Sequence, residues 1–497
     1  MVNMNVTIRR LSSLFIILLL FISGVAAYVQ IVNQAFINGP VLAQGDFDPR
    51  RCPPNDAPLR GRIYDRNGTL LAESVPDPKA ICGYTRKYSE PSLAPLIGYF
   101  SYRYGTAGIE RTFNKQLSGV DQGNNTSAVD DAKSKILRKP RYGQDITLTI
   151  DVKLQQAVNK IYDTHASGGV CQPNGTTPPG SIIVEKPDTG EILAMVSRPF
   201  FDPNKIDQTD YFAQLQNDPG KPLLNHATQA VYAPGSTFKT VTMIGGLEAG
   251  TTSLDKQFSQ DEAVNYVING EPINWDDYLH GYPSDLQFPM TLEQGYAYSD
   301  NVAFAREAVT LGKDKWLSTV RKFGIQTPGT DSDTVPFDGP YAPSTAYSAV
   351  TNGKPTDFSQ NLLAESGFGQ GQLLISPLTM ASVVSAVAAN GKLYIPHVVG
   401  KTQPHSLDAI VAQPQLFGGD QIFSADTASK VRQAMWSVTS YGTASTVFHN
   451  GIHLADSPVK EGGKTGTAQL ENGLPHTWWI SLAPDDQAPG GSAAQLA

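Results

Sequence analysis

Residues 233–239 of this 497-residue chain read Ala233-Pro234-Gly235-Ser236-Thr237-Phe238-Lys239, a turn followed by the apolar spacing of a helix. A serine at a helix start lies at the positive end of the backbone dipole, which stabilises a developing alkoxide. Lys239 lies on the same helix face about 5–6 Å away, so its amine can reach the Ser236 hydroxyl. If burial or a neighbouring cation lowers the pKa of Lys239, the neutral amine can act as a base. The stretch predicts an activated serine nucleophile.

This short pattern is weak on its own, because any Ser-x-x-Lys match can be an exposed surface pair. It occurs twice more, at Ser253/Lys256 and at Ser457/Lys460. The first match does not begin a helix, and the second contains Pro458. Neither has the turn-then-helix context of Ser236.

A second element, Ser299-Asp300-Asn301, precedes the helical run of residues 302–305. Such a loop can present a hydroxyl that relays a proton and an amide that holds a substrate carbonyl. The alternative is a plain helix cap, since serine, aspartate and asparagine all favour that position. A similar Ser-x-Asn at Ser359/Asn361 shows that the pattern also arises by chance.

The third element, Lys464-Thr465-Gly466-Thr467, occurs once. In a strand, Lys464 and Gly466 point to one face while Thr465 and Thr467 point to the other. The glycine lets another backbone or a ligand approach closely. A lysine and two threonines along such an edge suit a substrate carboxylate. The alternative is a charged edge strand that prevents aggregation.

The hydrophobic pattern predicts a mixed α/β architecture. A helix is expected from Asp151, followed by a β-hairpin of residues 181–185 and 191–197 around the turn 187–190. Helical patterns occupy residues 236–250, 300–323, 376–390 and 424–438, and a last strand pair is expected at 463–470 and 476–483. Helices between an early and a late strand pair predict an antiparallel sheet with a helical insertion. An earlier hairpin is expected around Asn67-Gly68.

Composition excludes several functional classes. The chain has 38 Lys and Arg against 46 Asp and Glu, a net charge of −8, which does not fit a nucleic-acid binder. Its three cysteines, Cys52, Cys82 and Cys171, lack the spacing of a zinc site. His449 and His453 flank Gly451, which indicates a loop rather than a ligand-bearing helix face. Neither a metal nor a cofactor is expected.

The N-terminus predicts a membrane anchor at residues 11–32. Arg9 and Arg10 precede an uncharged apolar stretch, which places residues 1–10 in the cytoplasm and the rest of the chain outside it. The alternative is a signal peptide cleaved after Ala27. We expect a linker and a pedestal domain at residues 33–145, and the chemistry-bearing domain at residues 146–497.

Together, the three elements resemble those of penicillin-binding proteins and class A β-lactamases. Four further stretches are similar to class B penicillin-binding proteins: residues 60–72, 104–110, 368–371 and 376–381. No segment resembles a glycosyltransferase domain, and residues 33–145 are too few for one. The resemblance therefore implies a dimerisation-like pedestal followed by a penicillin-binding transpeptidase domain.

The resemblance also implies acyl transfer on peptidoglycan stem peptides ending in D-alanyl-D-alanine. Ser236 would attack the penultimate carbonyl with Lys239 as base, and D-alanine would leave. Ser299 would pass a proton to the leaving amine, and Asn301 would hold the substrate amide. An amine of a neighbouring stem peptide would then take the acyl group, while a β-lactam would remain as a stable ester on Ser236.

The strand element takes the remaining roles that the resemblance implies. Lys464 would supply positive potential, and Thr465, Gly466 and Thr467 would bind the substrate carboxylate. The backbone N–H groups of Ser236 and Thr467 would form the oxyanion hole, each worth about 3–4 kcal/mol.

The resemblance leaves several alternatives open. A D,D-carboxypeptidase or β-lactamase-like hydrolase would share the motifs, and so would a β-lactam sensor or an inactive scaffold. A membrane glycosyltransferase of the division or elongation machinery is the implied partner. Cys52 and Cys82 could pair in the oxidising exterior or remain thiols.

The C-terminal segment departs from the family pattern. Class B proteins continue with a further strand and a C-terminal helix, whereas residues 484–497 contain two prolines and two glycines and no apolar alternation. We expect this segment to supply no central strand, so that the sheet lacks its middle in a truncated chain.

Overall fold

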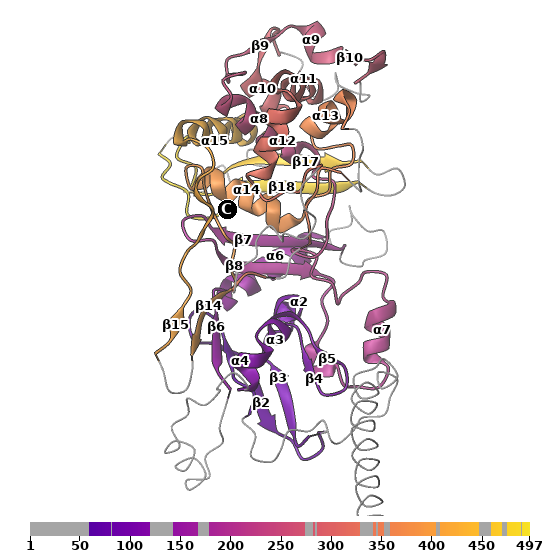
Figure 1. Ribbon diagram of the computed structural model, residues 1–497, viewed down its shortest axis with the longest axis vertical. Coiled ribbons are helices and arrows are strands. Elements are labelled where there is room, and N and C mark those ends of the chain that lie inside the picture. Colours follow the sequence, from indigo (N-terminus) through magenta and orange to yellow (C-terminus); the bar gives the residue numbers. More distant parts are fainter. Residues whose placement is uncertain are drawn as a thin grey trace, which may run out of the picture.

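The computed structural model describes residues 59–80, 82–119, 143–166, 178–273, 282–283, 286–328, 341–343, 346–351, 358–403, 408–446, 459–469, 475–488 and 490–497. Figure 1 shows a smaller N-terminal part and a larger C-terminal part stacked along the long axis of the molecule. The expected anchor and the first cysteine lie outside the described residues. Within these residues, no helix is long and apolar enough to cross a membrane.

The smaller part is built on a six-stranded sheet of order β15-β14-β6-β1-β2-β3. Asn67-Gly68 turns the chain between β1 and β2, with Gly68 at φ +87°, which confirms the first hairpin. The bounds are β1 Ile63–Tyr64, β2 Leu70–Pro76, β3 Tyr84–Tyr88, β6 Asp145–Leu148, β14 Val399–Gln403 and β15 Ile410–Val411. The two strands β14 and β15 come from late in the chain, so segments on both sides of residue 145 share this sheet.

Short helices and one small ladder cover this sheet. They are η3 Pro91–Leu93, α2 Ala94–Ile97, α3 Gly108–Thr112 and α4 Asn114–Ser118, with strands β4 Phe100–Ser101 and β5 Gly105–Thr106. Arg60 and Arg86 both pair with the fully buried Glu110, at 2.5 and 2.8 Å. Burial alone would raise the pKa of Glu110, but the two guanidinium groups hold it below its usual value. The ion pair thus joins two of the family-like stretches, residues 60–72 and 104–110.

The larger part contains the second predicted hairpin, β7 Gly180–Lys186 and β8 Glu191–Arg198, and the predicted helix α6 Val152–Ala166 packed on it. The last strand pair is β17 Gly462–Ala468 and β18 His476–Leu482. Helix α14, Pro377–Ala388, packs against β7 and β18. The mixed α/β architecture and both strand pairs are confirmed.

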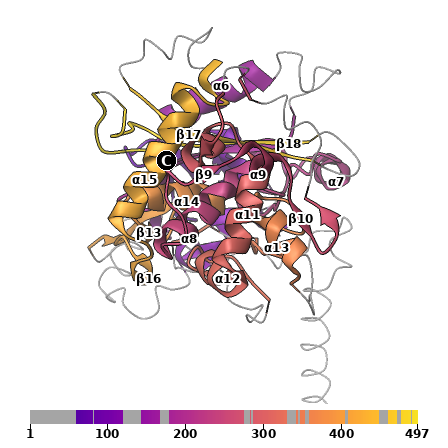
Figure 2. The same ribbon diagram turned by 90° about the horizontal axis from the view of Figure 1, so that it is seen from above.

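Helices fill the space above the last strand pair. They are η5 Gly235–Phe238, α8 Lys239–Glu248, α9 Gln260–Val264, α10 Leu292–Ala297, α11 Asn301–Leu311, α12 Lys313–Arg321, α13 Gln360–Gly367 and α15 Ala425–Ser440. Figure 2 shows α8 near the centre, and α11, α12 and α15 pack around it. The helical pattern predicted at 300–323 is confirmed, and Gly312, which adopts φ +86°, divides it into α11 and α12.

Smaller elements complete the larger part. They are η4 Pro203–Lys205, α7 Tyr211–Asn217 and the strands β9 Gln257–Phe258, β10 Val267–Ile268, β11 Glu271–Pro272, β12 Met290–Thr291, β13 Lys392–Tyr394 and β16 Leu416–Gln421. Each of these strands pairs with one other strand of the same group.

The two long strand pairs, β7–β8 and β17–β18, form separate two-stranded sheets. Among the described residues, the backbones of Leu496 and Ala497 link the two pairs. Leu496 pairs with Ala483 beyond β18, and Ala497 exchanges backbone hydrogen bonds of 2.8 and 2.9 Å with Glu185 of β7. The prediction that residues 484–497 supply no central strand is therefore confirmed for the described residues, but the expectation of unpaired backbone groups is wrong where Leu496 and Ala497 make these contacts. A two-residue backbone contact needs no apolar alternation, which is why the sequence pattern gave no sign of it.

Candidate active site

Ser236 lies in the 3-10 turn η5, and Lys239 is the first residue of the buried helix α8. Gly235, just before the serine, has φ +55°, and a Cβ atom there would lie 2.6 Å from the carbonyl oxygen of Thr467. The turn is further held by Trp478, whose indole donates a hydrogen bond of 2.9 Å to the Ala233 carbonyl. The turn that carries Ser236 therefore packs directly against strand β17.

The Lys239 amine joins the first two sequence elements. Its Nζ lies 2.9 Å from Ser236 Oγ, 2.6 Å from the Ser299 carbonyl oxygen and 2.7 Å from Asn301 Oδ1. The two carbonyl oxygens can only accept hydrogen bonds. They fix two N–H bonds of a neutral amine, so its lone pair is directed at the Ser236 hydroxyl. This is the geometry that a base requires.

The Ser299 hydroxyl joins the second element to the third. Its Oγ lies 2.8 Å from Lys464 Nζ and 3.2 Å from Lys239 Nζ. Ser299 adopts φ +65°, a left-handed conformation that is uncommon for serine. This backbone conformation turns both its carbonyl and its hydroxyl toward Lys239.

Both lysines have pKa values far below the usual value near 10.5. Burial lowers the pKa of Lys239 well below that value, and the Lys464 charge lowers it further, while Asp300 opposes the shift. Burial lowers the pKa of Lys464 to about 7. The lowered pKa of Lys239 favours its neutral form, which is the form that a general base needs.

Strand β17 displays the alternation that the sequence predicts. Lys464 and Gly466 are buried, whereas Thr465 is half-buried and Thr467 is exposed. A Cβ atom on Gly466 would lie 2.9 Å from the Pro234 carbonyl oxygen, so this position needs glycine for the close approach. The structure therefore brings all eight predicted residues into one region.

Three residues of this region had no assigned role in the sequence analysis. Asp300 caps helix α11 by accepting a hydrogen bond of 2.7 Å from the Ala303 N–H, and its other oxygen accepts one from the Tyr282 hydroxyl. Thr443 Oγ1 lies 2.8 Å from Thr465 Oγ1. Asp300 lies inside the second element, where its cap signal was visible. Tyr282 and Thr443 reach the site only through tertiary contacts, and no local pattern marks them.

The chance matches have ordinary structural roles. Lys256 pairs with the buried Glu307 at 2.5 Å. Ser359 caps helix α13, and Asn361 hydrogen-bonds to Glu271. Ser457 lies outside the described residues. Cys82 is disulfide-bonded, and its partner cysteine also lies outside them.

Comparison with known proteins identifies the family of the chain. The penicillin binding protein transpeptidase domain matches residues 180–489, and the penicillin binding protein A dimerisation domain matches residues 60–146. Peptidoglycan D,D-transpeptidase PbpA of Mycolicibacterium smegmatis is 29% identical over 97% of this chain and 91% of its own length. Peptidoglycan D,D-transpeptidase MrdA of Escherichia coli is 28% identical over 78% of this chain and 59% of its own length.

Solved structures give the same result. The penicillin G acyl-enzyme complex of penicillin-binding protein A from M. tuberculosis is 25% identical, covers 88% of this chain and 92% of its own, and superposes with a TM-score of 0.70. A D,D-transpeptidase domain from Eggerthella lenta is 26% identical, covers 88% and 92% of the two chains, and has a TM-score of 0.67. With the family match covering more than half of its length, the chain belongs to the penicillin-binding protein transpeptidase family, as a class B member.

Proposed function

We propose that this chain is a serine D,D-transpeptidase that cross-links peptidoglycan stem peptides through an acyl-enzyme on Ser236 and is trapped by β-lactams at the same residue. The observation that carries the proposal is the setting of Lys239. Its buried amine faces Ser236 Oγ at 2.9 Å while two carbonyl oxygens hold its N–H bonds. The names of the relatives support the same reaction.

The acylation step follows from these contacts. Lys239 takes the Ser236 proton as Oγ bonds to the penultimate D-alanine carbonyl carbon, and the carbonyl π electrons move to its oxygen. The N–H groups of Ser236 and Thr467 stabilise that oxyanion. The close packing of Gly235 on Thr467 supports this pairing. When the oxyanion collapses, the C–N bond breaks and terminal D-alanine leaves with its nitrogen protonated.

Ser299 supplies the route for that proton. Its hydroxyl lies between the Lys239 and Lys464 amines, at 3.2 and 2.8 Å. The proton passes from Lys239 through Ser299 to the leaving nitrogen, and Asn301 holds the substrate amide beside it. In the second half-reaction, the acceptor amine gives its proton back along the same route and takes the acyl group, which releases the Ser236 hydroxyl.

Substrate recognition falls to strand β17. Lys464 supplies the positive charge that attracts the terminal carboxylate, and the hydroxyls of Thr465 and Thr467 bind it. Gly466 lets the strand lie close to the turn that carries Ser236. A Cβ atom added at Gly466 would lie only 2.9 Å from the Pro234 carbonyl oxygen. Hydroxyl donors on an accessible strand face beside a buried cation suit a peptide carboxylate.

The cellular setting is also proposed. We place residues 1–10 in the cytoplasm, an anchor at 11–32, the pedestal at 33–145 and the transpeptidase domain at 146–497 outside the membrane. The charge pattern around the apolar stretch supports this orientation. A membrane glycosyltransferase of the division or elongation machinery would then supply glycan strands for cross-linking.

The test is covalent labelling of the full-length protein in detergent by fluorescent penicillin, with intact-mass measurement. Wild type should carry one stable penicilloyl group per chain, and Ser236→Ala none. Ser253→Ala is the matched control, because Ser253 belongs to the chance Ser-x-x-Lys match and should label as wild type does. Cross-linking of a stem pentapeptide to an acceptor amine, followed by mass spectrometry, then tests the transfer.

Two other results would contradict the proposal. Rapid release of hydrolysed penicillin would favour a β-lactamase-like hydrolase, and release of D-alanine without cross-links a carboxypeptidase. A folded protein that takes up no penicillin would favour an inactive scaffold.

A further inference from the structure

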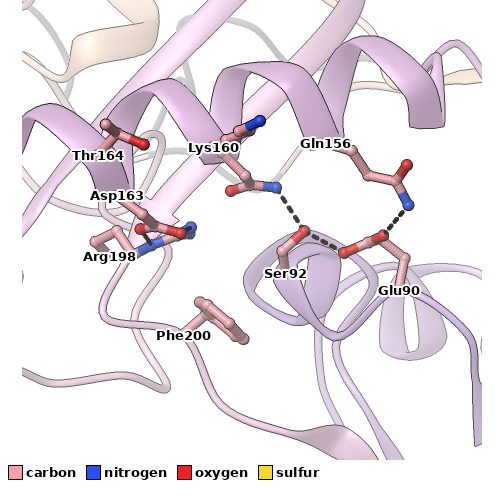
Figure 3. Close-up of a pocket in the computed structure, with 9 residues that line it drawn as sticks. Glu90, Ser92, Gln156, Lys160, Asp163, Thr164, Arg198 and Phe200 are labelled. Carbon is pink, nitrogen blue, oxygen red and sulfur yellow. Dashed lines mark hydrogen bonds and ion pairs between the residues drawn. The ribbon is translucent and has the colours of Figure 1, made fainter.

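A cavity lies between the pedestal and the transpeptidase part, and it shares no residue with the active site. Its volume is about 690 Å³, within the range of about 300–1,000 Å³ for small-molecule sites. Figure 3 shows helix α6 along one side, with Gln156 and Asp163 toward the cavity, and Lys160 of the same helix is also a lining residue. Glu90 and Ser92 of the pedestal lie opposite.

A chain of hydrogen bonds fixes the pedestal side. Gln156 Nε2 donates to Glu90 Oε2, Ser92 Oγ donates to Glu90 Oε1, and Asn159 Nδ2 donates to Ser92 Oγ, each at 2.7 Å. Each oxygen of the Glu90 carboxylate therefore accepts a hydrogen bond within the protein. This wall is already ordered before any ligand arrives.

One acceptor of this wall has no partner. Asn159 is only 7% exposed, and its Oδ1 has no hydrogen-bond partner among the described residues. Leaving such an atom unpaired costs about 1–3 kcal/mol, so a ligand that donates a hydrogen bond there would remove that cost. The next residue of α6, the exposed Lys160, also lines the cavity and can donate to a ligand carbonyl.

Arg198, Asp163 and Phe200 form another wall of the cavity. Arg198 forms a paired contact with Asp163, both hydrogen bonds being 2.9 Å long, and its guanidinium lies 4.6 Å from the centre of the Phe200 ring. Phe200 remains 38% exposed and lines the cavity. The arginine charge is thus neutralised by Asp163, and an aromatic surface is left for a ligand.

We propose that this cavity binds a segment of the glycan strand of peptidoglycan, through an N-acetylated sugar. The acetamido N–H would donate to Asn159 Oδ1, the acetyl carbonyl would accept from Lys160, and the apolar C–H face of the ring would pack on Phe200. The pairing of Arg198 with Asp163 and the internally satisfied Glu90 suit an uncharged ligand. The choice of sugar rests on the proposed peptidoglycan substrate, whereas binding does not need Ser236.

The experiment is isothermal titration calorimetry of the full chain in detergent with a β-1,4-linked tetramer of N-acetylglucosamine. Wild type, Ser236→Ala and Lys153→Ala should bind the tetramer equally. Lys153 is the matched control for Lys160, since both are exposed lysines of α6. Asn159→Leu, Lys160→Ala and Phe200→Ala should each weaken binding, by about tenfold for Asn159 and Phe200. Cellotetraose, which lacks the acetamido groups, should also bind at least about tenfold more weakly.

Several outcomes would overturn the inference. These are no binding by wild type, equal binding by Asn159→Leu and Phe200→Ala, or equal affinity for cellotetraose. Loss of binding in Ser236→Ala would place the sugar in the active site, and competition by a stem pentapeptide would make the cavity a peptide site. Penicillin labelling of the same samples is measured separately, so failure of the sugar site is distinguished from failure of the enzymatic proposal.

Discussion

The two buried lysines set opposite limits on the pH dependence of acylation. Lys239 must be neutral to take the Ser236 proton, so the rate rises as pH rises through its lowered pKa. Lys464, whose pKa is about 7, must be protonated to attract a carboxylate, so the rate falls as pH rises through that value. We predict a bell-shaped profile for the second-order rate constant of penicillin acylation, measured from about pH 5 to 10.

Lys464→Arg separates the two limits, because arginine stays protonated throughout this range. The acid limb should remain, and the alkaline limb should move upward by about two pH units or more. Thr465→Ser, which leaves both amines in place, is the control. An alkaline limb that stays near neutral pH in the arginine variant would contradict the role given to Lys464.

Tyr282 acts on Lys239 through Asp300. Its hydroxyl donates to the buried Asp300 carboxylate, which lowers the pKa of Asp300 against the raising effect of burial. Without that donor Asp300 is less ionised, and the pKa of Lys239 loses the opposing effect of the negative charge. Tyr282→Phe should therefore move the acid limb of acylation to lower pH and reduce the maximal rate about tenfold. Tyr347→Phe, at an exposed tyrosine, should leave both unchanged.

A lower rate with an unmoved acid limb would show that Tyr282 contributes only packing and does not affect the pKa of Lys239.

The contrast between Ser236 and Tyr282 also explains what the sequence could predict. Ser236 and Lys239 are three residues apart, so helix geometry alone brings their side chains together. Tyr282 meets Asp300 through a contact between positions 18 residues apart, and no spacing rule describes that.

At the scale of elements, the contact between η5 and β17 decides whether the nucleophile is aligned. A Cβ atom on Gly235 would lie 2.6 Å from the Thr467 carbonyl oxygen, and the residue also has φ +55°. Gly235→Ala should push the turn away from β17 and slow acylation by about 100-fold in a folded protein. Gly250→Ala is the matched control, because Gly250 has φ +64° but no atom within 4 Å of an added Cβ.

Equal acylation by the two glycine variants would show that backbone strain, rather than the contact with β17, matters at Gly235. Circular dichroism and thermal unfolding of both variants provide the comparison of folding. The acylation rates of both variants are measured with the same fluorescent penicillin. Because both glycines have a positive φ, a difference between the rates reports the contact with β17.

The sequence predicted helices and strands correctly where the paired segments are close together in the chain. The hairpin β7–β8 was predictable because residues 187–190 join two apolar runs directly. Strand β14 pairs with β6, about 250 residues earlier, and alternation within either strand does not identify such a partner. Gly312 was visible in the sequence, but apolar spacing continued on both sides of it and concealed the break between α11 and α12.

At the scale of the whole molecule, the buried carboxyl of Glu185 affects the free energy of unfolding. It is fully buried on β7, where its backbone holds Ala497, and neither carboxyl oxygen has a hydrogen-bond partner among the described residues. Burial raises the pKa of Glu185 from 4.5 to about 8, although the nearby Ser385 hydroxyl acts weakly in the opposite direction without forming a hydrogen bond. The folded state therefore keeps this carboxyl protonated at neutral pH.

A raised pKa in the folded state means that the folded protein binds the Glu185 proton more tightly than the unfolded chain does. Below its unfolded pKa of 4.5, the carboxyl is protonated in both states and favours neither. As pH rises from there to about 8, the unfolded chain gains stability by ionising, so the free energy of unfolding falls. Glu185→Gln, which is always neutral, should remove this fall and be more stable by about 3 kcal/mol at pH 7. Urea denaturation of the full chain at several pH values measures it, with Glu73→Gln, a half-buried strand position, as the control. A wild-type pH slope that persists in Glu185→Gln would mean that other groups, such as Asp485 with its pKa raised to about 6, control the stability of the fold.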